Sequence, residues 1–583
     1  MSSGSVSPRA AAWAVAAIAV LALALRLWSL AFGLPGIYNM DEKPILDRAL
    51  TFAKGDPNPH NFLYPTLYLY ALFAWEGFFF VAGRIAGVFD SLSAFRDAYF
   101  VDPSAHVLAA RALTALVGAA TTGAAYWYGS RLYNRAAGLA AALFLAVAPL
   151  AVRDAHYVKL DLPVTFFTVL AHAALAAIVV DPGRAARRRS WVVAGLLAGL
   201  AISTQYYAAF LAVPFLAVGA SDIRRSGRWQ TSARLLLWAG LATAAGFVAG
   251  SPFFLLEPAT VIRDFTELRE VDIDRAVSAG LFSSAAHYGG LLFRGALGVP
   301  VFLLALLGAM LSLRHDWRRG VLLLSFPVAF LLFVSNTFPA SRYLNIVLPS
   351  FCVAAGYGAW RLAVLAGSRA PLAMAATCVL AAIPGAYDSV RWNVFFGQDD
   401  TRTMARAFIE RNVPASSTVL VQPYSAPIRQ SREALAEALT ARLGDLAQAP
   451  LKHQLQLAAA SPPGPAYRVL YVGESGKTQA VPGDVDKIYI SPRAVTPGQG
   501  LAVLREAGVD VVVLTHYGTT PPAFTSMVAA LERDARRLER FSPYRGDIDP
   551  ATAPVPPFRH NGNTWIHPTL ERPGPVVEIW QIE

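Results

Sequence analysis

The chain opens with a long apolar segment, AAAWAVAAIAVLALALRLWSLAF at residues 10–32, followed at residues 33–50 by GLPGIYNMDEKPILDRAL. The apolar segment is long enough to cross a hydrocarbon core, which takes about 20 residues. Arg9 precedes it without any acidic residue, so the positive-inside rule places its start in the cytoplasm. The pair Asp41-Glu42 then lies at the outer membrane surface, where burying carboxylates costs free energy. It is either part of a functional site or an ordinary solvated helix N-terminus, and both interpretations are open.

The composition of the whole chain indicates a polytopic membrane protein. Of its 583 residues, 55% are hydrophobic and 15% are charged, and the mean hydropathy is +0.42. A soluble protein has roughly a quarter of its residues charged. The net charge of +11 comes from short basic clusters between apolar runs, which is typical of cytoplasmic loops and not of a nucleic-acid-binding surface. Cys352 and Cys378 both fall inside apolar segments, so no disulfide is expected.

Apolar segments recur along the first 390 residues and alternate with basic clusters. The apolar segments are Ala10–Phe32, Leu63–Gly83, His106–Ser130, Ala136–Val152, Leu162–Val180, Trp191–Thr204, Tyr206–Ala220, Leu235–Leu255, Gly298–Leu313, Val321–Ser335, Tyr343–Trp360 and Pro371–Ala386. The basic clusters are Arg131–Arg135, Arg184–Ser190, Arg224–Arg234, Arg314–Arg319 and Arg361–Arg369. If every segment crosses, all these clusters lie outside, against the positive-inside rule. If Leu63–Gly83, which holds Pro65, Glu76 and many aromatic residues, lies along the outer surface, the clusters fall inside and about eleven crossings remain. A plain span with reversed charge bias is the alternative.

From Arg391 to Glu583 the composition becomes that of a soluble α/β domain. The pattern predicts a helix over 401–412 and strands over 417–422, 487–490, 509–516 and 576–582. An Ala/Pro/Gln-rich loop is expected over 447–465. We therefore expect a transmembrane domain over residues 1–390 and an extracytoplasmic domain over 391–583.

The outward loops collect the side chains with catalytic potential. Lys159, Arg342 and Lys43 are cations able to hold a phosphate. A carboxylate such as Asp41 can take a proton from an attacking hydroxyl, and cations can stabilise a leaving phosphodiester without a general acid. This mixture suits a lipid-linked phosphate donor; it requires no metal, and a divalent cation is left open. The other candidates for substrate contact are Arg26, His60, Tyr64, His156, Asp161 and Tyr343.

Several of these candidates also have an ordinary structural explanation. Arg26 would snorkel to the interface, Asp161 would cap the helix that follows it, and Tyr343 would belong to an aromatic belt. His60 and His156 lack metal-ligand spacing and are expected to be hydrogen-bonded interfacial residues.

Five segments, taken in order, carry a family likeness. They are LRLWSL…YNMDE (25–42), NFLYPTLYLYALF (61–73), ARALTALVGAATTGAAYWYGSRLYN (110–134), PLAVRDAHYVKLDLPVTFF (149–167) and SRYLNIVLPSF (341–351). Their order resembles the GT-C superfamily of glycosyltransferases, close to protein O-mannosyltransferases and bacterial aminoarabinose transferases, which use polyprenyl-phosphate sugars. The resemblance implies a bundle of transmembrane helices with outer interfacial helices, and inverting transfer to an acceptor hydroxyl.

The resemblance also assigns roles to residues. It makes Asp41 the catalytic base and gives Glu42 a supporting or acceptor-binding role. The sequence departs from the family pattern at LYPT, where Tyr64 precedes a single proline in place of two prolines preceded by His or Lys. The phosphate is therefore assigned to Arg342 and Lys159.

These features predict a multi-pass protein of the plasma (inner) membrane with a cytoplasmic N-terminus. The expected partners are a polyprenyl-phosphate sugar donor, the lipid bilayer and a protein, lipid or glycan acceptor, without nucleic acid. A lipid-linked sugar flippase or transporter is the alternative, although candidate charges at one face and the lack of symmetry between halves count against transport. A non-catalytic subunit that binds sugar lipids would share the same fold.

Overall fold

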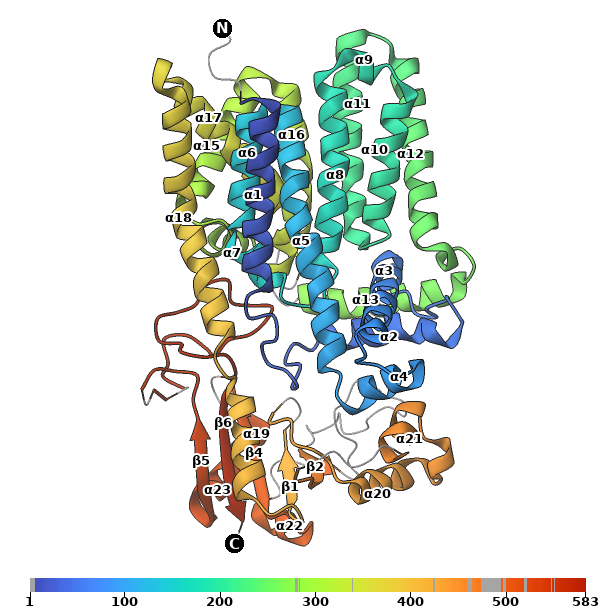
Figure 1. Cartoon of the computed structure of the whole chain (residues 1–583), viewed down its shortest axis with the longest axis vertical. Coiled ribbons are helices and arrows are strands. Elements are labelled where there is room, and N and C mark those ends of the chain that lie inside the picture. The colour runs from blue at the N-terminus through green and yellow to red at the C-terminus, as the bar shows by residue number, and fades with distance from the viewer. Residues whose placement is uncertain are drawn as a thin grey trace.

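Apolar helices form a bundle at one end of the molecule, and a sheet occupies the other end (Figure 1). The computed structural model describes residues 6–277, 282, 284–337, 339–422, 425–458, 464–472, 494–495, 500–517, 522–546, 548–549 and 551–582. Each segment predicted to cross the membrane contains a bundle helix. These helices are α1 (Pro8–Leu27), α5 (Ser104–Leu132), α6 (Arg135–Ala146), α8 (Asp161–Val180), α10 (Arg188–Ile202), α11 (Ala212–Ser226), α12 (Trp229–Gly250), α15 (Val299–His315), α16 (Trp317–Val334), α17 (Leu348–Val364) and α18 (Ala370–Phe396).

The bundle makes the chain a multi-pass membrane protein. Among the described residues, seven helices are long and apolar enough to cross a membrane, or eight if the pair Ala285–Ala296 and Val299–His315, bent by 117°, is one span. Helix α6 has 12 residues, fewer than the ~20 that a crossing needs. The helix lengths do not establish a total of about eleven crossings, so that number stays a prediction.

A layer of further helices lies at the sheet-facing end of the bundle (Figure 1). It contains α2 (Glu42–Thr51), α3 (Leu67–Ile85), α4 (Leu92–Val101) and α13 (Pro258–Val277). Helix α3 covers most of the segment Leu63–Gly83, which the positive-inside rule assigned to the membrane surface. Figure 1 shows this helix beyond the ends of α10 and α12, beside α2 and α13. The Glu76 carboxylate of α3 is buried against His106 of α5, 2.9 Å from its Nδ1. The position of α3 along the membrane surface stays a prediction.

Small residues allow the bundle helices to approach closely. A Cβ added at Gly199 in α10 would overlap the carbonyl of Thr243 in α12, and one at Gly358 in α17 would overlap the carbonyl of Leu304 in α15. Lipid supplies no hydrophobic force between helices, so close backbone packing of this kind stabilises membrane bundles.

The sheet has six strands in the order β3-β2-β1-β4-β6-β5. The strands are β1 (Thr418–Val421), β2 (Arg468–Val472), β3 (Ala494–Val495), β4 (Val511–His516), β5 (Ala535–Phe541) and β6 (Val576–Ile582). The first four are parallel, while β6 runs antiparallel to both β4 and β5. The associated helices are α19 (Thr401–Asn412), α20 (Arg432–Leu443), α21 (Leu451–Ala458), α22 (Gly500–Glu506) and α23 (Pro522–Asp534).

The predicted elements of this region have different outcomes. Helix α19 and strands β1, β4 and β6 lie where the sequence predicted them. The predicted loop over 447–465 is wrong in part because α21 forms within it, and the predicted strand 487–490 lies outside the described residues. Helix α18 ends at Phe396, beyond the predicted domain limit at residue 390, so that division stays a proposal.

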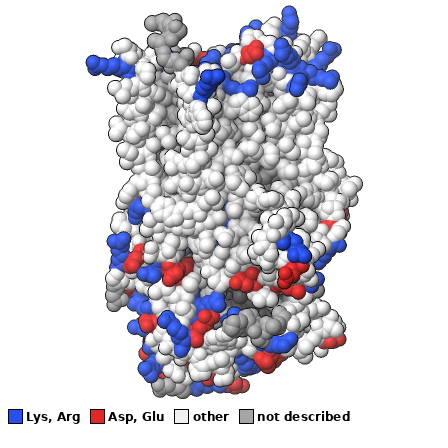
Figure 2. Space-filling model, in the orientation of Figure 1, with Lys and Arg blue, Asp and Glu red and all other residues white. Residues whose placement is uncertain are grey.

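Basic residues gather at the end of the bundle opposite the sheet. Figure 2 shows Lys and Arg side chains concentrated there, above a broad band almost without charge. The helix junctions α5–α6, α8–α10, α11–α12, α15–α16 and α17–α18, which carry the five predicted basic clusters, turn at that end (Figure 1).

The sheet domain also returns a segment to the bundle. This return segment, Phe558–Ile566, precedes β6. The ring of Phe558 lies 5.4 Å from that of Trp392 in α18, and the Arg294 guanidinium lies 4.1 Å above the ring of Trp565. A Cβ at Gly295 would overlap the side chain of Thr564. The two parts of the molecule are therefore in direct contact at the sheet-facing end of the bundle.

Candidate active site

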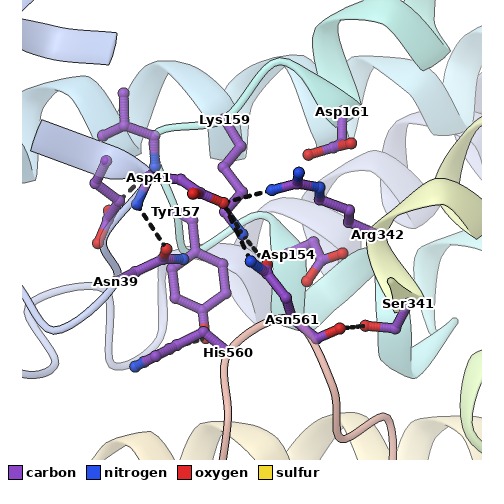
Figure 3. Close-up of polar contacts among 12 residues, drawn as sticks. Asn39, Asp41, Asp154, Tyr157, Lys159, Asp161, Ser341, Arg342, His560 and Asn561 are labelled. Carbon is purple, nitrogen blue, oxygen red and sulfur yellow. Dashed lines mark hydrogen bonds and ion pairs between the residues drawn. The ribbon is translucent and has the colours of Figure 1, made fainter. Parts of the chain in front are cut away.

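A carboxylate and two cations from distant parts of the chain meet at the sheet-facing end of the bundle (Figure 3). Oδ2 of Asp41 lies 2.5 Å from Nη1 of Arg342 and 3.4 Å from Nζ of Lys159. Nδ2 of Asn561 donates a hydrogen bond to the same oxygen, at 3.2 Å. We call these four residues the Asp41 group.

Local structure fixes each member of the group. Asp41 is the residue before α2, and Lys159 lies in the loop between α7 (Pro149–Asp154) and α8. Arg342 lies in the short helix η5 (Ser341–Ile346), immediately before α17. The Asp154 carboxylate accepts a hydrogen bond of 2.6 Å from Asn345, which ties the loop that follows α7 to η5. Lys159 and Arg342 are thereby held near the same carboxylate oxygen.

The electrostatics of the group favour an ionised Asp41. Burial raises the pKa of Asp41, but the charges of Lys159 and Arg342 and the hydrogen bond from Asn561 outweigh it, so the pKa lies below its usual value. The Asp41 side chain keeps 27% of its surface exposed and Arg342 keeps 25%, whereas Lys159 keeps 3%. The carboxylate is thus charged, partly accessible and flanked by two cations.

Glu42, the neighbour of Asp41, is enclosed. Its oxygens accept hydrogen bonds of 2.8 Å from both Nε and Nη2 of Arg111, and neither side chain is exposed. The backbone N–H of Val158 donates to it as well, at 3.1 Å. Glu42 therefore joins α2, α5 and the loop before Lys159, which is a supporting position for the Asp41 group.

Three further candidates lie close to the group. Oδ1 of Asp161 accepts a 3.2 Å hydrogen bond from the Tyr207 hydroxyl, and its carboxylate lies beside the Arg342 guanidinium in Figure 3. Burial raises the pKa of Tyr64, on which the charges of Arg342 and Asp41 also act. The Tyr343 ring lies 5.6 Å from the Arg342 guanidinium. These residues surround the cations without bonding to Asp41.

The other candidates have partners elsewhere. Lys43 pairs with Asp47 at 2.6 Å, and the exposed imidazole of His60 pairs with Asp56 and Glu257, each at 2.8 Å. The ring nitrogens of His156 lie within 2.8 Å of the backbone oxygens of residues 152 and 28.

Arg26 lies inside the bundle and does not extend to the interface, and its assignment to the substrate stays a prediction. Its side chain is 1% exposed, and it donates hydrogen bonds of 3.1 and 3.2 Å to the carbonyls of Ala146 and Leu145 at the end of α6. The snorkelling interpretation is therefore wrong. Arg26 adds hydrogen bonds to carbonyls at the C-terminal end of α6, where the helical pattern stops.

Two residues of the site have no counterpart among the sequence candidates. Arg111 lies inside an apolar segment, and a charge at membrane depth is a signal that it has a partner. Asn561 belongs to the polar stretch RHNGN, which carries no motif. Its contact with Asp41 spans 520 positions and depends entirely on the tertiary fold.

Among the described residues, no group of three His, Cys, Asp or Glu side chains is arranged to hold a metal ion. The divalent cation that the sequence left open stays a prediction.

The fold and this site define a class: a multi-pass membrane protein with a charged site where the bundle meets a soluble α/β domain. Residues 104–255 match the family model described as dolichyl-phosphate-mannose-protein mannosyltransferase. The match covers α5 to α12 and confirms the predicted resemblance to these enzymes, which supports a glycosyltransferase. A sequence search of curated proteins finds no match.

Solved structures show a distant likeness. The oligosaccharyltransferase AglB from Archaeoglobus fulgidus, in complex with an inhibitory peptide and a dolichol-phosphate, aligns with 11% identity and a TM-score of 0.46 over 87% of this chain and 69% of its own. ArnT from Cupriavidus metallidurans, bound to undecaprenyl phosphate, aligns with 15% identity and a TM-score of 0.44 over 91% of this chain and 97% of its own.

Proposed function

We propose that the protein transfers a sugar, with inversion, from a polyprenyl-phosphate-linked donor to an acceptor hydroxyl. The observation that carries the proposal is the contact of the Asp41 carboxylate with both Arg342 and Lys159. A phosphate monoanion or dianion needs cations of this kind, an Arg fork and a Lys point charge. A base for the acceptor hydroxyl must lie within reach of the same centre.

In this mechanism Arg342 and Lys159 hold the donor phosphate, and Asp41 takes the proton of the acceptor hydroxyl. The hydroxyl oxygen attacks the anomeric carbon from the side opposite the phosphate. The bond from that carbon to the phosphate oxygen breaks, and polyprenyl phosphate leaves with the bonding electrons, stabilised by the same two cations. Because two positive charges already face the phosphate, this route does not require a divalent cation.

We further propose that the site faces the outside of the plasma (inner) membrane. The basic clusters at the opposite end of the bundle would be cytoplasmic under the positive-inside rule. The N-terminus would then be cytoplasmic, and the domain over 391–583 extracytoplasmic. The donor would enter the site from the outer leaflet.

The test is sugar transfer by the purified protein in lipid nanodiscs, with a panel of polyprenyl-phosphate sugars and release of polyprenyl phosphate as the readout. We expect wild type to consume one donor. Asp41→Asn should lose at least about 100-fold in rate, because general-base catalysis contributes 10²–10⁴-fold, while still binding the donor. Unchanged transfer by Asp41→Asn would eliminate Asp41 as the base.

A flippase would give a different result. It would move labelled lipid between the leaflets of a vesicle without releasing polyprenyl phosphate, and Asp41→Asn would have no transfer to abolish. Mass spectrometry of envelope glycans and glycoproteins from a deletion strain then identifies the acceptor, as the class of molecule that lacks one sugar residue.

A further inference from the structure

We propose that Asn561, supplied by the C-terminal domain, is a positioning residue of the transfer site that orients Asp41 and holds Lys159 beside it. The inference rests on the proposed function, because it assigns a task to Asn561 within that reaction. It also gives the soluble domain a part in the chemistry.

The Asn561 amide bridges the two charged groups. Nδ2 donates to Oδ2 of Asp41 at 3.2 Å, and Oδ1 accepts from Nζ of Lys159 at 2.5 Å. The charges on either side fix this orientation, since only the amide nitrogen can donate to a carboxylate and only the amide oxygen can accept from an ammonium group. Oδ2 of Asp41 therefore receives all three donors of the group. Among the described residues, Oδ1 of Asp41 has no hydrogen-bond partner, which leaves it as the oxygen able to accept a proton.

The backbone of the return segment is anchored independently of this side chain. The Asn561 carbonyl accepts hydrogen bonds from the backbone N–H and the hydroxyl of Ser341, at 3.1 and 2.9 Å. Arg153 donates to the carbonyl of Asn563, and the Tyr157 hydroxyl lies 2.8 Å from Nδ1 of His560. Replacing the Asn561 side chain thus removes the amide bridge while these anchors of the segment remain.

The bridge has a consequence for the order of events. Asp41 and the donor phosphate compete for the same cations, Arg342 and Lys159. When the phosphate shares the charge of these cations, Asp41 loses part of the attraction that suppresses its basicity. Asn561 can still donate to Oδ2 of Asp41, so that Oδ1 of Asp41 remains free to face the acceptor hydroxyl. Donor binding therefore activates the base, and Asn561 preserves its orientation during the exchange.

The experiment measures donor-saturated transfer and the pH profile of kcat/KM for wild type, Asn561→Ala, Asn561→Asp and the control Asn563→Ala. The Asn563 side chain accepts from the backbone N–H of Arg559, and its substitution leaves the Asp41 group intact. The titratable groups facing Asp41 are Lys159, Arg342, Asp161 and Tyr64, and they are the same in all four proteins.

We expect kcat to fall about tenfold in Asn561→Ala, the usual effect of losing a hydrogen bond to a charged group. The acid limb of the profile should move to higher pH in Asn561→Ala, because a donor that lowers the pKa of Asp41 is lost. It should move further in Asn561→Asp, which keeps an acceptor for Lys159 but adds a negative charge. Asn563→Ala should match wild type.

An unshifted acid limb in both Asn561 variants, with rates equal to those of Asn563→Ala, would overturn the inference. A purely structural role would lower the amount of folded protein without moving the limb. If wild type transfers no sugar from any donor, the proposed function fails instead, so the two failures are distinguishable.

Discussion

Asp41 and Glu42 are adjacent in sequence, yet their carboxylates occupy opposite kinds of site. Glu42 is closed: two parallel hydrogen bonds join it to Arg111, and neither side chain is exposed. Asp41 is open: it shares one oxygen among Arg342, Lys159 and Asn561 and remains 27% exposed. A closed pair fixes the positions of helices, whereas an open group can exchange one of its partners for a ligand. Under the proposed function, Glu42 supports the structure of the site and Asp41 takes part in the reaction.

The largest expected effect concerns the closed pair. Arg111→Met leaves a buried carboxylate without its charged partner, and among the described residues only the backbone N–H of Val158 still donates to it; breaking a buried ion pair in this way costs about 3–5 kcal/mol. We expect the midpoint of thermal unfolding in detergent to drop strongly. Arg342→Met is the matched change in the open group. It should lower the midpoint much less than Arg111→Met does, because Arg342 and Asp41 are partly exposed, while it abolishes transfer. Equal destabilisation by both variants would remove the distinction.

A smaller effect should come from a substitution that changes the geometry of the Asp41 group but keeps its charge. Arg342→Lys keeps a cation but loses the planar fork that binds phosphate through two hydrogen bonds. We expect the KM for the donor to rise about tenfold, with unfolding unaffected. An unaltered KM would mean that the phosphate binds elsewhere.

The open group should also give stability a modest pH dependence. The pKa of Asp41 is lowered in the folded protein, so its ionisation stabilises the fold above the unfolded pKa of about 4. That contribution is lost as the pH falls through the folded pKa. Unfolding midpoints of wild type and Asp41→Asn should therefore converge below about pH 4 and differ at pH 7. A constant difference between them at every pH would contradict this linkage.

The smallest effect is expected next to the acidic pair. Lys43 pairs with Asp47 one turn along α2, and partly exposed pairs of this kind contribute about 0–1 kcal/mol. Lys43→Ala should leave transfer and donor KM unchanged. A rise in KM would restore Lys43 as the substrate contact that the sequence suggested.

The sequence predicted the open group better than the closed pair. Asp41, Lys159 and Arg342 each follow or precede an apolar helix, so topology alone places them at one membrane surface. Arg111 and Arg26 could not be assigned in this way, because their partners depend on which helices pack side by side. Arg26 binds the C-terminal end of α6. The apolar segment continues beyond this helix, so the sequence does not show where α6 ends.

The sheet domain shows the same limit. Runs of β-branched residues predicted β1, β4 and β6, since strands buried on both faces are marked by composition. Asn561 lies in a segment without periodicity, and nothing local distinguishes it from Asn563. Its position against Asp41 follows from the attachment of the return segment to α18 and η5.

The contact between Asp41 and Asn561 joins the beginning of the polypeptide to a point 520 residues later. During synthesis, the segments that hold Asp41, Lys159 and Arg342 are made long before the return segment that holds Asn561. A ribosome that stops early thus releases a membrane-embedded product with its cations in place but without the amide between them. Completion of translation becomes a condition for a fully assembled site, so unfinished chains in the bilayer would be poorly able to consume the lipid donor.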